Sequence, residues 1–237
     1  MTWVRSVAFL LWMYGLLLVM GILWLPGLLA PRAVVRFGSR LWSRLVLAGL
    51  RVLCGVRVEF RGLEHRPRGA ALIAGKHQSQ LDTIAPYVLL DDAAYVLKQE
   101  LFGLPLFGWH AKKAGMIGID RAGGARALKQ MVADARAAQA EGRQIVIFPE
   151  GTRQAPGASP DYKPGVAGLY RDLGLPCVLL ATNSGLTWPA HGLVRKPGTA
   201  VFEFLEPIPP GLKRSQFMQQ LEERLECASN ALSNRPS

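Results

Sequence analysis

The first 58 residues contain no acidic side chain, and this feature most limits what the chain can fold into. Within them, residues 6–31 carry no charge of either sign and are rich in Leu, Trp and Met. Because a helix rises about 1.5 Å per residue, roughly 20 apolar residues cross the hydrocarbon core of a bilayer. We therefore expect this segment to attach the chain to a membrane, either by spanning it or by entering one leaflet and returning. Pro26 is expected to kink or end the helix near its far end.

Two other interpretations of the apolar run are weaker. A cleaved signal peptide usually ends in a small-x-small site, and no clean site of that kind follows this long stretch. A buried core helix is unusual for an uncharged run of such length at a chain terminus. Membrane attachment is the interpretation that we carry forward.

Arginines follow the apolar run at helical spacing, at positions 32, 36, 40, 44 and 51. At about 100° per residue they fall within roughly a third of the helix circumference, with apolar residues mostly opposite. This pattern predicts an interfacial helix with its basic face among anionic lipid headgroups and its apolar face in acyl chains or against the domain; a solvated face is the alternative. Since positive charge flanking an apolar segment stays cytoplasmic, the body of the protein is expected on that side.

The formal net charge of +11 calls for anionic partners: nucleic acid, an anionic membrane or a phosphorylated substrate. The basic residues adjoin a bilayer-length apolar run, and no nucleic-acid-binding motif is recognised, so we expect no nucleic-acid partner. The three cysteines give no pairing pattern, which agrees with a reducing compartment.

Beyond the basic segment, short apolar runs alternate with helix-like stretches, of which residues 124–141 are the clearest. This alternation predicts an α/β fold, with a mostly parallel central sheet flanked by helices and N-terminal membrane-associated helices. We expect two parts, membrane-anchoring helices at 1–54 and an α/β domain at 55–237, the latter ending in an amphipathic helix over 214–232. The runs expected to form strands are 56–61, 70–74, 94–97, 116–119, 145–148, 178–181 and 201–205.

His77 and Asp82 are the strongest candidates for chemistry. They directly follow the expected strand at 70–74, across a strand-to-helix turn that can bring the carboxylate to the imidazole. Such a carboxylate fixes the tautomer and raises the basicity of the far nitrogen, which suits removing a proton from a hydroxyl nucleophile. A chance pairing is the alternative. No metal site is expected, because the other histidines are scattered and no HxxxH or CxxC pair exists.

Three further clusters lie at strand ends. The string Phe148–Arg153 (FPEGTR) forms a sharp turn in which Arg153 offers a planar fork to a phosphate, or else a solvated side chain. Gly115–Arg121 (GMIGIDR) ends in a charged pair that could also be a local surface interaction. Leu175–Gly185 is an apolar strand that ends in small polar residues.

In this order and spacing, H-x4-D, GxxxIDR, FPEGTR and the Pro-led apolar strand resemble the glycerolipid acyltransferases, particularly the bacterial 1-acylglycerol-3-phosphate acyltransferases. The resemblance covers roughly residues 55–210, and the N-terminal membrane segment is also similar. The FPEGTR motif is highly specific for this family, whereas H-x4-D is specific only when it occurs together with FPEGTR. The chain departs from the family at two positions: Lys76 stands where Asn often precedes the His, and Gly118 where an aromatic residue is common.

The resemblance implies that His77 is the general base and Asp82 its orienting residue, with direct transfer of a fatty acyl group from a thioester to a lysophospholipid hydroxyl. It implies no cofactor, but acyl-CoA or acyl carrier protein (acyl-ACP) as co-substrate, and a bacterial inner membrane location with the catalytic domain on the cytoplasmic face. Two alternatives stay open: another lysolipid acceptor such as a lyso-ornithine lipid, or a non-catalytic membrane protein that binds anionic lipids. The residues implied in substrate binding are Glu150, Gly151, Thr152, Arg153 and Arg121, and Lys98 is a further candidate at a strand end.

Overall fold

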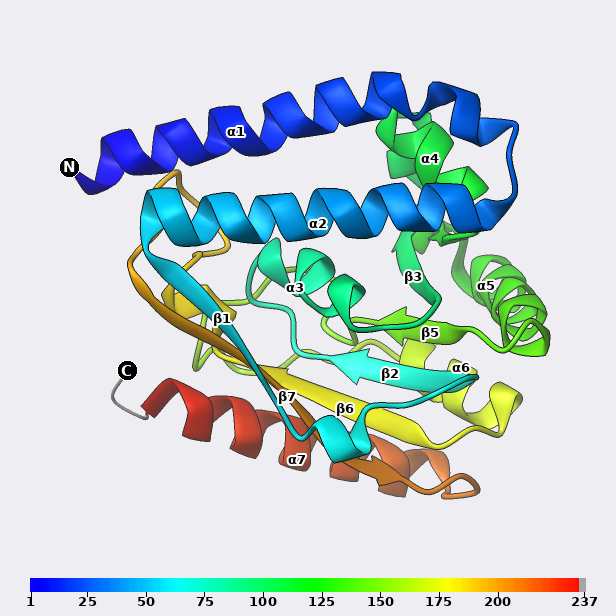
Figure 1. The fold of residues 1–237 in the computed structure, drawn as a ribbon. Coiled ribbons are helices and arrows are strands. Elements are labelled where there is room, and N and C mark those ends of the chain that lie inside the picture. Colours follow the sequence, from blue (N-terminus) through cyan, green and yellow to red (C-terminus); the bar gives the residue numbers. More distant parts are fainter. Residues whose placement is uncertain (235–237) are drawn as a thin grey trace.

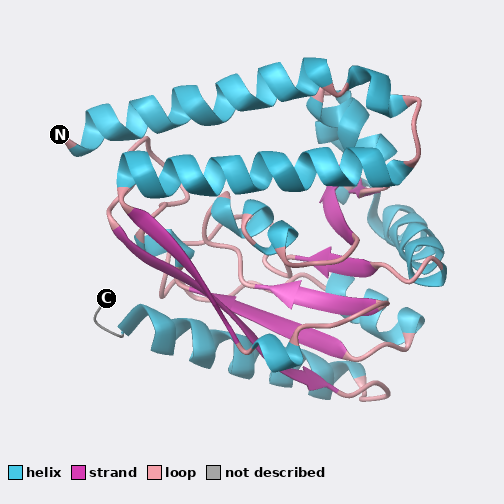
Figure 2. Cartoon of the chain, in the orientation of Figure 1, coloured by secondary structure: helices cyan, strands magenta, loops and turns pink. Residues whose placement is uncertain are grey.

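A seven-stranded mixed sheet forms the centre of the molecule in the computed structural model, which describes residues 1–234 (Figures 1 and 2). The strand order is β1-β7-β6-β2-β5-β3-β4. All neighbouring pairs are parallel except β6 and β7. The strands are β1 (Val56–Arg61), β2 (Ala71–Gly75), β3 (Ala93–Lys98), β4 (Ile117–Ile119), β5 (Gln144–Ile147), β6 (Cys177–Thr182) and β7 (Gly198–Ile208).

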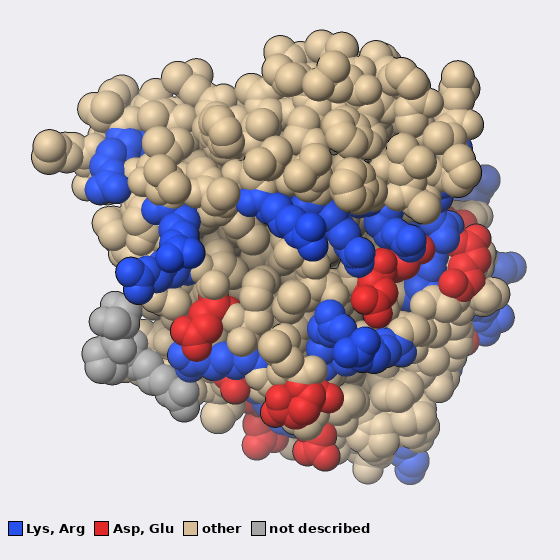
Figure 3. All heavy atoms as spheres, viewed as in Figure 1, with Lys and Arg blue, Asp and Glu red and all other residues tan. Residues whose placement is uncertain are grey.

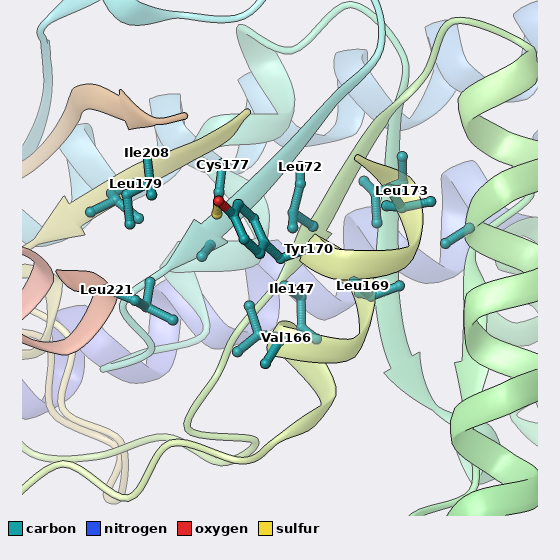
Figure 4. Packing of buried hydrophobic residues seen from close by; sticks show 14 of the residues in the cluster. Leu72, Ile147, Val166, Leu169, Tyr170, Leu173, Cys177, Leu179, Ile208 and Leu221 are labelled. Carbon is teal, nitrogen blue, oxygen red and sulfur yellow. The ribbon is translucent and has the colours of Figure 1, made fainter. Parts of the chain in front are cut away.

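The central strands are buried on both faces, which explains their uninterrupted apolar sequences. In β2, Leu72 and Ala74 face one helical layer, and Ile73 between them faces the other. The first layer holds α5 (Gly124–Ala140), α6 (Gly165–Leu173) and α7 (Arg214–Asn234), and its packing around Tyr170 is seen in Figure 4. The expected α/β class with a mostly parallel sheet is confirmed.

The opposite face of the sheet is covered by N-terminal helices and by a short helix, α3 (Leu81–Ile84). Helices α1 (Thr2–Leu23) and α2 (Arg32–Cys54) run side by side along this face, and α4 (Phe107–Lys113) lies against one end of them (Figure 1). Helix α1 ends three residues before Pro26, as this proline predicts. Within the described residues, α1 is the one helix that is long and apolar enough to cross a bilayer.

Three of the five arginines of α2 bind the α/β domain, which differs from the expectation that this face lies among lipid headgroups. Arg32 and Arg36 form ion pairs with Asp92 at 3.1 and 2.8 Å, and Arg40 donates to the backbone carbonyl of Asp91 at 2.8 Å. The physical reason is the acidic loop before β3, which lies alongside α2 and supplies acceptors that the sequence pattern alone did not place there. The exposed arginines of the helix are Arg44 and Arg51.

Candidate active site

The loop after β2 holds His77 and Asp82 in direct contact. The Nδ1 atom of His77 lies 3.1 Å from Oδ2 of Asp82. The same oxygen accepts hydrogen bonds from the backbone N–H groups of Gln78 at 2.7 Å and Ser79 at 2.8 Å. The other carboxylate oxygen accepts from the hydroxyl of Ser184, which follows β6. These donors fix the buried carboxylate, so the imidazole meets a rigid partner.

The imidazole ring is held on its face as well as at its edge. His77 stacks on Phe148, with ring centroids 4.3 Å apart and planes inclined by 20°. Its side chain is partly exposed, and in residues 1–234 its Nε2 atom makes no hydrogen bond to the protein. With Nδ1 donating to Asp82, Nε2 is the nitrogen that can accept a proton. The ring is therefore oriented as a general base requires.

The FPEGTR turn packs directly against this loop because β2 and β5 are neighbouring parallel strands whose carboxyl ends meet. The backbone N–H of Gln154 donates to the carbonyl of His77 at 2.8 Å, and the carboxylate of Glu150 accepts from the N–H of His77 at 2.7 Å. Gly151 adopts a φ of +68°, a conformation that other residues reach only with strain. The turn is thus part of the framework that holds the base.

The carboxylate of Glu150 points into the protein rather than into solvent. Its side chain is 1% exposed, and its Oε1 atom lies 2.7 Å from Nζ of Lys76. Burial raises the pKa of Glu150, while the ammonium group of Lys76 opposes that rise. Both carboxylate oxygens of Glu150 face protein groups, so the side chain positions the loop of His77; its predicted role in substrate binding stays a prediction.

Cationic side chains gather over the turn. A Cβ atom built on Gly151 would lie 3.6 Å from Cζ of Arg121 and 3.6 Å from Cγ of Lys163, so both side chains cross this glycine. Arg153 and Thr152 lie on the exposed surface of the turn. Lys163 was not predicted as a site residue, because its place shortly after the motif carries no distinctive pattern. In the fold, its backbone N–H donates to the carbonyl of Pro149, which brings it to the turn.

Lys98 does not join this group. It ends β3 with its side chain 49% exposed, and its Nζ atom lies 3.4 Å from Glu100. Its neighbour Leu97 lines the cavity described next, but Lys98 does not. The structure therefore gives no support to a substrate-binding role for this lysine.

A cavity of about 540 Å³ opens beside the imidazole. His77 and Arg153 line it together with apolar side chains from α1, α2 and the region around α4. Helices α1 and α2, which the sequence predicts to anchor the chain in a membrane, also form a wall of the cavity. Residues that represent its lining are Met13, Leu17, Met20, Trp42, Ile84, Tyr95, Leu97 and Phe107.

Tyr95 brings a buried polar group to this apolar wall. Its side chain is 3% exposed, and within the described residues its hydroxyl has no hydrogen-bond partner. Burial raises its pKa, so the hydroxyl stays protonated. Tyr95 also stacks on Phe148, with centroids 6.2 Å apart, which extends the aromatic support behind His77.

Comparison with known proteins identifies the class. The family model described as "Acyltransferase" matches residues 57–183, a span that contains the H-x4-D, GxxxIDR and FPEGTR motifs. The chain therefore belongs to the acyltransferase family, as its motifs indicated.

Individual relatives narrow the class. The chain is 35% identical to a 1-acyl-sn-glycerol-3-phosphate acyltransferase of Pseudomonas aeruginosa over 83% of its length and 77% of the relative. It is 31% identical to the human 1-acyl-sn-glycerol-3-phosphate acyltransferase alpha over 60% of its length and 50% of that protein. The crystal structure of the 1-acyl-sn-glycerophosphate acyltransferase PlsC from Thermotoga maritima superposes with a TM-score of 0.83, covering both chains fully at 19% identity, which establishes the shared fold.

Proposed function

We propose that this acyltransferase moves a fatty acyl group from an acyl thioester to the sn-2 hydroxyl of 1-acylglycerol-3-phosphate, giving phosphatidic acid. The observation that carries the proposal is that one apolar cavity is lined both by His77, which contacts Asp82, and by Arg153. His77 can thus deprotonate a hydroxyl and Arg153 can bind a phosphate, and both lie beside an apolar space that suits an acyl chain. The names of the curated relatives support the same acceptor.

In the proposed mechanism, Nε2 of His77 removes the proton from the acceptor hydroxyl as its oxygen attacks the thioester carbonyl carbon. Asp82 stabilises the imidazolium that forms. The tetrahedral intermediate then collapses, the C–S bond breaks, and the imidazolium returns its proton to the departing thiolate. The proposed transfer is direct. Cys54 and Cys177 are buried, and burial raises the pKa of both thiols, while the exposed Cys227 does not line the cavity beside His77.

The phosphate of the acceptor would bind over the FPEGTR turn. Arg121 and Lys163 cross Gly151, and Arg153 extends from the same turn to the cavity. A guanidinium group can bind two phosphate oxygens at once, which fixes the direction of the glycerol backbone. This arrangement would present the hydroxyl to His77 while the acyl chains remain on the apolar side.

The acyl donor would place its chain in the apolar cavity between the N-terminal helices and the sheet. A cavity of about 540 Å³ lies in the range typical of ligand sites. Acyl-CoA and acyl carrier protein carry the same phosphopantetheine thioester, so either donor fits the chemistry.

We further propose that α1 embeds in the cytoplasmic leaflet of the bacterial inner membrane instead of spanning it. Helix α1 is held along α2 because Nε1 of Trp12 donates to the carbonyl of Leu45 at 3.0 Å. It is also held to the loop before β7, because the hydroxyl of Ser6 accepts from the backbone N–H of Arg195 at 2.8 Å. Its outer surface is apolar and nearly free of charge (Figure 3). Exposed Arg44 and Arg51 remain available to anionic headgroups.

The test is a panel of lysolipid acceptors assayed with both donors on the purified protein in detergent. The expected result is thioester-dependent formation of phosphatidic acid from 1-acylglycerol-3-phosphate, with far lower turnover of zwitterionic lysophospholipids and of a lyso-ornithine lipid. Preference for a lyso-ornithine lipid would refute the acceptor but keep the chemistry. Lipid binding without any thioester consumption would refute the enzyme itself.

A further inference from the structure

Lys76 lies at the centre of a buried charge network that reaches from the active-site loop to the C-terminal helix. Its Nζ atom is 2.7 Å from Oε1 of Glu150 and 2.5 Å from Oε1 of Glu226 on α7. The hydroxyl of Tyr162 donates to the same oxygen of Glu226 at 2.7 Å, and the ammonium group lies 5.9 Å from the centre of the Tyr162 ring. Three side chains from three separate segments therefore meet around the ammonium group of Lys76.

Burial makes this network sensitive to the loss of any member. The side chains of Lys76 and Glu150 are 2% and 1% exposed, and that of Glu226 is 16% exposed. Charges removed from water to this extent are tolerated when they are paired, and loss of one partner leaves an uncompensated charge. Glu226 and Glu150 together fix the position of Lys76 from two sides.

The network ends at the backbone of the proposed base. The second oxygen of Glu150 accepts from the backbone N–H of His77 at 2.7 Å. Lys76 is the preceding residue, and its own N–H donates to the carbonyl of Leu180 in β6 at 2.9 Å. A shift of Lys76 or of the Glu150 carboxylate therefore moves the peptide that carries the imidazole.

We infer that Glu226, which lies in α7 and outside the motifs of the catalytic loops, is a positioning residue for acyl transfer: it holds Lys76, which holds Glu150 beneath the backbone of His77. This inference rests on the proposed function of His77 as the base. Glu226 touches no reacting atom, so its influence passes through Lys76. The inference predicts that loss of the Glu226 charge lowers kcat and leaves KM for the acceptor nearly unchanged, because the cationic side chains over Gly151 are not part of the network.

Glu226→Gln tests the inference because it removes the charge while keeping an oxygen for the hydroxyl of Tyr162. Glu223→Gln, an exposed change of the same charge on the same helix, is the matched control. We expect kcat of Glu226→Gln to fall by about tenfold with KM for the lysolipid within about twofold, as follows from displacing a catalytic group slightly. The control is expected to retain wild-type kcat and KM.

A double-substitution cycle separates positioning from general loosening of the fold. In a Lys76→Met background, where kcat is expected to be low, adding Glu226→Gln is expected to cause no further fall in kcat, since the group through which Glu226 acts is gone. An equal loss in both backgrounds overturns the inference. So does a Glu226→Gln variant that melts at a lower temperature yet keeps wild-type kcat.

An NMR measurement of the His77 backbone amide gives a readout that does not depend on turnover. This N–H donates to a carboxylate, which moves its proton resonance downfield. In Glu226→Gln the resonance is expected to shift upfield, while Glu223→Gln leaves it in place; an unchanged resonance in Glu226→Gln overturns the inference. If the resonance shifts in Glu226→Gln but the wild-type protein shows no acyl transfer, the proposed function fails, whereas the coupling between Glu226 and the backbone of His77 stands.

Discussion

Replacement of Asp82 by Asn separates the electrostatic role of this carboxylate from its structural one. In the structure, Oδ2 accepts from two backbone N–H groups and faces Nδ1 of His77, while Oδ1 faces the hydroxyls of Ser79 and Ser184. An Asn side chain can keep its amide oxygen at the first position and direct its NH₂ group to the hydroxyls, which can accept. The loop is therefore expected to fold in the Asp82→Asn variant.

What Asp82→Asn loses is the negative charge that stabilises the imidazolium of His77. We expect kcat to fall on the order of a thousandfold, which corresponds to about 4 kcal/mol of transition-state stabilisation. In contrast, Asp82→Ala leaves the buried N–H groups of Gln78 and Ser79 without an acceptor. Each unpaired buried N–H group costs roughly 1–3 kcal/mol, so Asp82→Ala is also expected to lower the free energy of unfolding by about 2–6 kcal/mol.

The assay is release of free thiol from acyl-CoA at saturating 1-acylglycerol-3-phosphate, with thermal unfolding measured on the same preparations. The expected result is a stable but nearly inactive Asn variant and an unstable, inactive Ala variant. A well-folded Asp82→Asn protein that keeps kcat within about threefold of the wild type would refute the assignment of Asp82 to the base.

Three further predictions concern the substrate and the cavity. Arg153→Ala is expected to raise KM for 1-acylglycerol-3-phosphate about tenfold or more and to leave KM for a zwitterionic acceptor unchanged, because only the phosphomonoester loses a charged partner; equal effects on both acceptors would argue against a phosphate contact. Tyr95→Phe removes a buried hydroxyl that has no hydrogen-bond partner within residues 1–234, so thermal unfolding should report a stability unchanged or raised by about 1 kcal/mol; a marked loss of stability would reveal an unrecognised partner. The added methyl group of Gly38→Ala would clash with the indole of Trp24, which lines the cavity, so turnover should shift toward shorter acyl-CoA chains. Gly49→Ala is the control: its methyl group would clash with the indole of Trp12, which does not line the cavity, so the melting temperature should change while the chain-length preference does not.

Local pattern was sufficient to predict most of the strands and the loop that carries the base. The expected strand at 70–74 is β2 (Ala71–Gly75), and the expected helix at 214–232 is α7 (Arg214–Asn234). His77 and Asp82 are five residues apart, so a single turn brings them together and their contact could be anticipated. Strand order, by contrast, depends on pairings between distant segments, such as β1 with β7, and no periodicity encodes these.

The parts that the sequence did not reveal are contacts between distant residues. Lys76 and Glu226 are 150 positions apart, and each alone resembles an ordinary surface charge. The pairing of Arg32 and Arg36 with Asp92 is equally long-range, and it turned a predicted lipid-facing surface toward the domain. A buried charge is recognisable only when the fold shows what surrounds it.

The most direct test of the whole account compares the wild type with His77→Ala in the conversion of 1-acylglycerol-3-phosphate and acyl thioester to phosphatidic acid. We expect a fall in kcat of about a thousandfold or more in a protein that still folds, because His77→Ala removes the base while the backbone hydrogen bonds of the loop remain. A folded His77→Ala protein that forms phosphatidic acid at the wild-type rate would contradict the account.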